Sequence, residues 1–476
     1  MHLIDFVIFV IYFTIVLGIG VFFYRKNKTR EDYYVGNRSI SASHVGLSIV
    51  ATDVGGGFSI GLGGLGFLIG LSGSWLLFTG LVGAWMVAVL VIPIIKQVDT
   101  KQGLLTFPDF LRLTYNEKVA ALAALISAIG YLGFTSAQIL AGAKLAAGTV
   151  FARVSFMTPI DFSLYVMAGI ILLYTVLGGL KAVIYTDTFQ WIILLSGLIL
   201  FGIPFAVYKT GGVAALQSGL PESFFSLTNI SGVQFINWFF TIVPIWFIAM
   251  TLYQRIYATP SIKSARKAFF MAGLLEYPIM AFSGVILGMI ARLYFPSADA
   301  EMAMPMMLRE VLPIGIRGIV IAAYFSAIMS TADSCLLASS GNVVNDIIEK
   351  YSNFKFSHKQ FVVLSQVVTL VIGVMTLVIA RSFQMVLEII LHAYSLMVAG
   401  LLVPTLMAYF GRKTSSRAAL SAMVTGGGLT LYLIFSETAM PYDLDPSIWG
   451  LLVSLSSYII VLLLEQLLKK AYVGQR

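Results

Sequence analysis

Long apolar runs constrain the fold of this chain more than any other feature of its sequence. A helix needs about 20 predominantly apolar residues to cross a membrane, and we count about thirteen such runs. Of the 476 residues, 59% are hydrophobic and only 11% are charged. Because soluble domains carry about 25% charged residues, the sequence predicts an all-α polytopic membrane protein with about 13 transmembrane helices.

Basic residues indicate how these helices face. The first apolar run, residues 4–24, is followed by four basic residues between positions 25 and 30. A cleaved signal peptide carries its basic residues before the apolar run, so we expect this helix to be retained. Lys and Arg accumulate in cytoplasmic loops, and basic segments alternate along the chain with segments that carry few basic residues. This pattern predicts an N-terminus outside the cell and a cytoplasmic C-terminus.

Several other function classes fit the sequence poorly. The net charge of +8 is spread over the short segments between apolar runs, so we expect no nucleic-acid partner. The single cysteine, Cys335, excludes an internal disulfide. Residues 61–66 match a dinucleotide-binding glycine pattern and residues 57–61 match a serine-hydrolase pattern. Both lie inside an apolar run, without the strand that those motifs follow, and we therefore predict that the protein is not an enzyme.

A first polar cluster at membrane depth surrounds Asp53. An ionisable group there costs roughly 2.5–3.5 kcal/mol on insertion scales, so it persists mainly beside a cavity, a partner or an ion. Three glycines follow at residues 55–57, and they favour a break in the helix. The carbonyls that a break exposes, together with a carboxylate, are the oxygen ligands that an alkali cation needs. The alternative is a continuous glycine-packed helix in which Asp53 bonds to a neighbouring helix.

A second polar cluster lies in a later apolar run. Four small residues stand at positions i, i+3, i+4 and i+7: Ala327, Ser330, Thr331 and Ser334. This spacing places them on one face of a helix. In one interpretation the hydroxyls belong to an ion site. In the other they bond to carbonyls of their own helix or join two helices. Asp333 adds an ionisable group to the same segment.

Both clusters resemble motifs of the sodium/solute symporter family, most closely its bacterial proline-transporter branch. Residues 51–75 are similar to that branch's first core helix and the segment after it, and residues 327–337 are similar to its eighth helix. Residues 178–187 resemble the start of the fifth helix, and residues 254–268 resemble the end of the sixth helix with the loop that follows.

The resemblance implies a LeuT-like inverted-repeat fold of five plus five helices, in one membrane transport domain spanning residues 1–476. The helix at residues 4–24 is then peripheral and precedes the core. The core helices span about 43–410, and two further peripheral helices span about 418–468.

The resemblance also implies a sodium site, made of backbone carbonyls and side-chain hydroxyls. Its expected ligands are Ala51, Val54, Ala327, Ser330 and Thr331. Asp53 is expected to bind sodium or to support its binding. Asp187 and Asp333 are expected to lie close together and to hold a second cation or a shared proton, because two neighbouring carboxylates cannot both ionise cheaply. The residues expected to contact the solute are Gly57, Phe134, Gln138 and Trp246.

These expectations define a function. We predict a sodium-coupled symporter, functional as a monomer in the lipid bilayer of the cytoplasmic (inner) membrane, that imports a small organic solute by alternating access. A membrane sensor that binds the solute without moving it, and an intramembrane enzyme, are the alternatives. A channel is disfavoured because no ion filter or ring of charges stands out. Amino acids, short carboxylates and quaternary amines all remain open as solutes.

Overall fold

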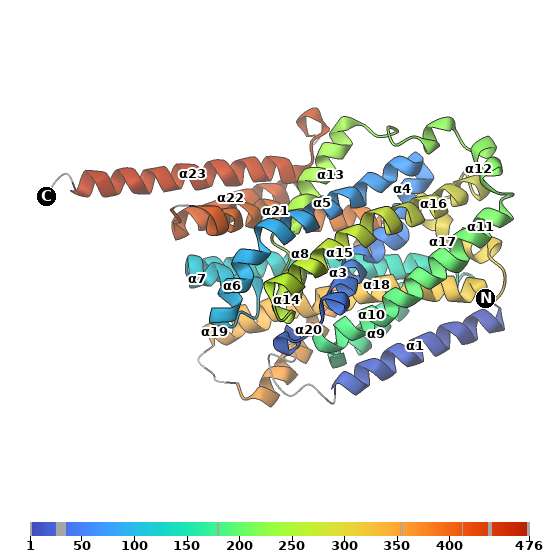
Figure 1. Ribbon diagram of the computed structural model, residues 1–476, viewed down its shortest axis with the longest axis horizontal. Coiled ribbons are helices and arrows are strands. Elements are labelled where there is room, and N and C mark those ends of the chain that lie inside the picture. Colours follow the sequence, from blue (N-terminus) through green and yellow to red (C-terminus); the bar gives the residue numbers. More distant parts are fainter. Residues whose placement is uncertain are drawn as a thin grey trace.

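The computed structural model describes residues 2–24, 35–178, 180–352, 354, 356–411, 413–436 and 440–473, and helices are the only regular elements within this part of the chain. Most of them run along the long axis of the molecule (Figure 1). The two termini lie at opposite ends of that axis, and the last helix projects beyond the others (Figure 1).

The N-terminal half consists of helices and short 3-10 or π segments, the latter marked η. These elements are α1 (Leu3–Tyr24), η1 (Gly36–Arg38), α3 (Ala42–Gly56), η2 (Gly57–Leu62), α4 (Gly63–Ile69), η3 (Gly70–Ser74), α5 (Trp75–Leu90), α6 (Ile92–Gln102), α7 (Phe107–Thr114), α8 (Glu117–Gly148), α9 (Pro159–Gly178), α10 (Leu180–Leu195), η4 (Ser196–Gly202), α11 (Ile203–Lys209), α12 (Val213–Gly219) and η5 (Glu222–Phe225).

The C-terminal half continues in the same way. Its elements are α13 (Gly232–Ile245), α14 (Met250–Ala258), α15 (Ile262–Leu275), η6 (Glu276–Ala281), α16 (Phe282–Tyr294), α17 (Ala300–Val311), α18 (Ile316–Gly341), η7 (Asn342–Ile348), α19 (Glu349–Tyr351), α20 (His358–Ser382), α21 (Val386–Phe410), α22 (Ser416–Phe435), η8 (Pro441–Asp443) and α23 (Pro446–Val473).

The chain is a multi-pass membrane protein, although its expected number of spans is not confirmed. Among the described residues, nine helices are long and apolar enough to cross a membrane, or ten if α13 and α14, bent by 43°, form one span. Helices α1 and α9 contribute shorter apolar segments. The first predicted core helix comprises α3, η2 and α4, and its backbone departs from helical geometry at Gly55, near the end of α3.

Helix α18 lies at the centre of the bundle. It packs against α3, α8, α10 and α1, and 94% of the apolar window in the span it begins is buried. Alanine and serine are frequent along α18, and small side chains allow helices to approach closely. The spans of α20 and α23, by contrast, bury only 28% and 22% of their apolar windows. They therefore present the apolar outer face that membrane helices turn to lipid.

A buried ion pair fixes where α21 begins. The Nζ atom of Lys144 in α8 lies 2.7 Å from Oε2 of Glu301 in α17. The same oxygen accepts a hydrogen bond of 2.9 Å from the backbone N–H of Val386, the first residue of α21. A carboxylate at a helix N-terminus is favourable because it meets unpaired amides and the positive end of the helix dipole. This anchoring positions the helix that brings Tyr394 to the site described next.

Candidate functional site

The site is built around the break in α3. Gly55 has φ +24° and ψ −138°, outside the helical region. A Cβ atom at this position would lie 2.3 Å from Oγ1 of Thr331 and 2.7 Å from Oε1 of Gln138. Only glycine leaves room for both neighbours. The N–H of the next residue, Gly56, donates to Oε1 of Gln138, which satisfies a backbone donor at the break.

The two hydroxyl groups of α18 reach the carbonyls of α3 just before this break. The Oγ atom of Ser330 lies 2.7 Å from the carbonyl oxygen of Ala51 and 3.0 Å from that of Ala327. The Oγ1 atom of Thr331 lies 2.8 Å from the carbonyl oxygen of Thr52, 3.1 Å from that of Ala51 and 3.2 Å from that of Ala327. Only two hydroxyl protons are therefore available for these five short oxygen–oxygen contacts.

This oxygen cluster, formed by Ala51, Thr52, Ala327, Ser330 and Thr331, joins the two polar segments that the sequence singled out. The carbonyl of Val54, another expected ligand, is one turn away and accepts from the N–H of Gly57. Of these seven residues, all except Gly57 are buried. An excess of lone pairs over donors in a buried cluster favours a bound cation.

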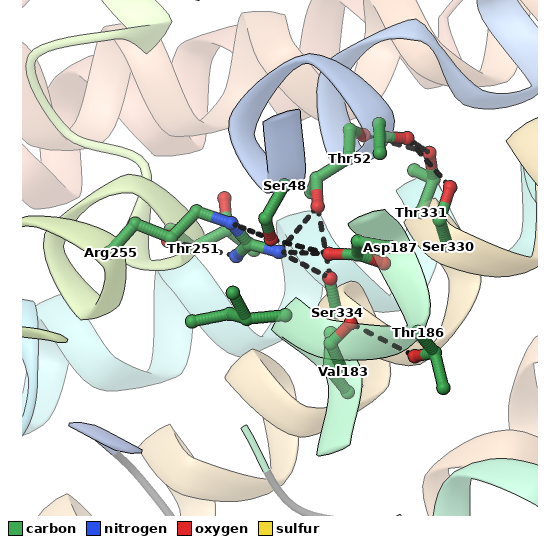
Figure 2. A network of polar contacts seen from close by, with 12 residues as sticks. Ser48, Thr52, Val183, Thr186, Asp187, Thr251, Arg255, Ser330, Thr331 and Ser334 are labelled. Atoms are coloured by element: carbon green, nitrogen blue, oxygen red, sulfur yellow. Dashed lines mark hydrogen bonds and ion pairs between the residues drawn. The ribbon is translucent and has the colours of Figure 1, made fainter. Parts of the chain in front are cut away.

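A buried arginine lies on the side of Thr52 that is opposite to Ser330 and Thr331 (Figure 2). Arg255 of α14 is fully buried. Its Nη2 atom lies 2.8 Å from Oγ of Ser334 and 3.1 Å from Oδ2 of Asp187, and its Nε donates to Oγ of Ser48 at 2.9 Å. Nη2 also lies 2.5 Å from Oγ1 of Thr52. Helices α3, α10, α14 and α18 thus converge on one guanidinium group.

The Arg255 network gives Asp187 a partner that the sequence argument did not include. Asp187 was expected to form a carboxyl pair with Asp333, but its charge is balanced by Arg255 and its Oδ2 also accepts from Ser48. Asp333 is buried in α18 as well, and a shared proton or second cation between the two aspartates stays a prediction. The sequence argument placed Arg255 only at the end of the segment resembling the sixth helix and gave it no partner. The informative signal was its position directly after an apolar run.

A small cavity adjoins the break in α3. It is lined by Thr52 and Asp53, by the aromatic rings of Tyr131, Phe134 and Tyr394, and by apolar residues of the segments around α14 and α21. The rings of Phe134 and Tyr394 meet edge to face, with centroids 5.1 Å apart. About 20 Å³ of the cavity is open to a water-sized sphere, which is room for roughly one or two waters. The described conformation is therefore closed around this cavity.

The four residues expected to contact the solute have different environments. Phe134 lines the cavity. Gln138 instead holds the helix break through its amide oxygen, and Gly57 faces Ile390, which would lie 3.3 Å from a Cβ atom.

Trp246, which is expected to contact the solute, does not line this cavity. Its ring packs against Gly83 of α5 and stands edge-on to Phe269 of α15. The helix that carries it unwinds between α13 and α14, directly after Pro244. This unwinding leaves Ile245 and Ala249 on the cavity side and turns Trp246 away.

Comparison with known proteins places this architecture in a family. A model of the sodium:solute symporter family matches residues 33–426, most of the chain. The chain belongs to this family. The resemblance predicted from its motifs is confirmed, and membership in the sodium:solute symporter family makes it a sodium-coupled importer of a solute. The proteins that it resembles include transporters from bacteria.

Three similar proteins illustrate the relationship. This symporter is 28% identical over 474 residues to the high-affinity proline transporter PutP of Bacillus subtilis (strain 168), covering 96% of this chain and 98% of that protein. It is 26% identical over 474 residues to the sodium/pantothenate symporter of Escherichia coli (strain K12), covering 95% and 94%. A solved structure of a Na⁺-coupled sialic acid symporter shares the fold, with a TM-score of 0.76, 21% identity and 96% coverage of both chains.

Replacing Gly55 by alanine is expected to destabilise the symporter and to weaken its response to sodium. The new methyl group would collide with Thr331 and Gln138, and the backbone would be held at a positive φ. Such overpacking costs about 1–3 kcal/mol. We expect a lower melting temperature and a smaller rise of that temperature on adding sodium. The matched control is Gly428→Ala in α22, where a Cβ meets no atom within 4 Å and both quantities should stay at wild-type values.

Proposed function

We propose that the oxygen cluster binds the sodium ion that drives import. Its ligands are Ala51, Ala327, Ser330 and Thr331 of the cluster, together with the carbonyl of Val54 one turn away. The supporting observation is the five short oxygen–oxygen contacts served by two protons. A sodium ion replaces the missing donors, because carbonyl and hydroxyl oxygens are the ligands that hard cations prefer. Neutral ligands suit a monovalent ion, whose charge needs little compensation.

The position of the cluster supports coupling between ion and solute. Its oxygens come from α3 and α18, so a bound sodium ion holds the broken helix against the central helix. Thr52 belongs both to the cluster and to the cavity wall. Sodium binding therefore favours the arrangement in which the solute site is formed, and solute binding favours the arrangement in which the sodium site is formed. This reciprocal preference is what coupling between two sites requires. Asp53 adds negative charge beside the ion without entering its ligand set.

The finer features of the function follow from the same proposal. The solute is a small organic molecule that binds in an expanded form of the cavity beside Phe134. It enters the cytoplasm across the inner membrane by alternating access. The whole chain acts as one transport domain and as a monomer surrounded by lipid, with its N-terminus outside and its C-terminus inside. It catalyses no covalent reaction.

Uptake into proteoliposomes tests this function. Purified protein is reconstituted, and the accumulation of labelled proline, pantothenate and glycine betaine is compared under an inward sodium gradient and an equal potassium gradient. We expect at least one compound to accumulate above its equilibrium level with sodium alone. Sodium-dependent binding without accumulation would favour the sensor instead. Accumulation that is equal in potassium would contradict sodium coupling.

A further inference from the structure

A second cavity, which we call the basic cavity, lies at the end of the bundle where the chain begins (Figure 1). Three arginines line it: Arg153 in the segment after α8, Arg309 in the last turn of α17 and Arg317 in the first turn of α18. About 540 Å³ of it is open to a water-sized sphere, which is within the range of roughly 300–1,000 Å³ that small-molecule sites occupy. It shares no lining residue with the cavity beside Asp53.

Positive charge exceeds negative charge around the basic cavity. The Nε atom of Arg309 lies 2.7 Å from Oε1 of Glu310, the acidic residue of the cavity wall. The Nε atom of Arg317 lies 3.3 Å from Oδ2 of Asp5, a buried carboxylate that also accepts from two backbone amides at the start of α18. Arg153 forms no hydrogen bond or ion pair with the residues that the structure describes. Three guanidinium groups therefore meet two carboxylates, and the excess favours an anionic ligand.

The arginines indicate which anion fits. The planar fork of a guanidinium group matches the oxygens of a phosphate, to which it can donate two parallel hydrogen bonds. Arg309 uses its Nε for Glu310, and both of its Nη groups have no partner among the described residues. Arg153 contributes its whole set of donors. A phosphate group in the basic cavity would therefore meet donors from two separate segments of the chain.

The surface beside the basic cavity indicates where such a phosphate comes from. His2 lines the cavity, and α1 begins at the next residue with an exposed apolar face. The large apolar side chains of its first three turns that are exposed are Leu3, Ile4, Phe6, Val7, Val10 and Ile11. In a membrane protein such a face contacts acyl chains, and the phosphates of the lipids lie where the apolar face ends. The basic cavity opens at this level, so a membrane lipid can reach it with its headgroup.

We propose that the basic cavity binds the phosphate of an anionic phospholipid whose acyl chains lie along α1. Basic pockets between transmembrane helices recognise anionic headgroups in this way. Arg317 both lines the cavity and pairs with Asp5 of α1. The bound lipid therefore reinforces the attachment of this peripheral helix to α18, the central helix of the bundle. This site is separate from the sodium and solute sites and does not depend on the function proposed for them.

Matched ligands test the proposal. The delipidated protein in detergent is titrated with phosphatidylglycerol, with phosphatidylcholine of the same acyl chains and with glycerol phosphate, the soluble part of the first headgroup. Native mass spectrometry measures binding, and the melting temperature is followed in parallel. We expect phosphatidylglycerol to raise the melting temperature and to bind about fivefold more tightly than phosphatidylcholine, because it carries one more net negative charge. Glycerol phosphate should bind at least about a hundredfold more weakly, since it has no acyl chains to bury.

Arginine substitutions locate the site. Arg153→Gln should weaken the binding of phosphatidylglycerol about fivefold, and Arg153→Gln/Arg309→Gln should weaken it about twentyfold or more. Both variants leave the ion pair of Arg317 with Asp5 in place. The matched control is Lys209→Gln, which removes one positive charge from an exposed side chain of α11, at the same end of the bundle (Figure 1). Its affinity should equal that of the wild type.

Four results would overturn the proposal. Phosphatidylcholine that binds as tightly as phosphatidylglycerol excludes a role for the positive charge. Wild-type affinity in Arg153→Gln/Arg309→Gln excludes the basic cavity, and a melting temperature that still rises with sodium shows that the variant is folded. An equal loss in Lys209→Gln indicates attraction to surface charge in general. Glycerol phosphate that binds as tightly as the lipid makes the occupant a soluble anion.

Discussion

The double variant Ser330→Ala/Thr331→Ala is expected to lose sodium-dependent uptake while remaining folded in the membrane. It removes both hydroxyl oxygens of the oxygen cluster and leaves the carbonyls of Ala51 and Ala327 without the groups that face them. Each hydroxyl ligand that is removed should cost about 1.5–3 kcal/mol of the binding free energy of the charged ion. The affinity for sodium should therefore fall by at least about a hundredfold. Initial rates of uptake across a range of sodium concentrations measure the effect.

Ser340→Ala is the matched control for this double variant. It removes a buried hydroxyl of the same helix, which donates to the carbonyl of Leu337 at 3.1 Å within α18. Its sodium dependence should equal that of the wild type. The assignment fails if the double variant transports with an unchanged apparent affinity for sodium.

Replacement of Arg255 is expected to have the largest effect on stability. Arg255→Met leaves Asp187 as an unmatched buried charge and removes the donor shared by Ser48 and Ser334. Breaking a buried ion pair on one side costs about 3–5 kcal/mol. We expect a marked fall of the melting temperature in detergent and little or no uptake, because four helices lose their common contact.

A second substitution distinguishes charge from packing. In Arg255→Met/Asp187→Asn neither charge remains, so part of the lost stability should return. If this double variant melts at or below the temperature of Arg255→Met, the uncompensated charge of Asp187 is not the cause of the instability. The contacts of the guanidinium with the hydroxyls would then account for it.

Local sequence patterns predicted the break in the helix and the face of hydroxyl groups, whereas the meeting of the two at one site was implied by the family resemblance. Residues 55–57 are consecutive glycines, and the helix departs from regular geometry at Gly55. The spacing of Ser330 and Thr331 placed them on one face of α18, and that face meets Ala51 across the break. Both features depend on a few neighbouring residues, so they can be deduced without knowing how the helices pack.

The surroundings of the cavity could not be predicted in the same way. Helical periodicity fails where α13 unwinds into α14, and this irregular turn directs Trp246 away from the cavity while it buries Arg255. The position of the buried Glu276 side chain depends on the glycine at position 80 of another helix, where a Cβ atom would lie 2.1 Å from its Oε1. Such long-range complementarity leaves no periodic signal in the sequence of either helix.

Equilibrium binding of radioactive sodium to the purified protein, without solute, tests the central claim most directly. The oxygen cluster predicts saturable binding to the wild type and to Ser340→Ala. It also predicts that binding is lost in Ser330→Ala/Thr331→Ala. Sodium isotherms that coincide for the wild type and the double variant would contradict the claim that this cluster holds the driving ion.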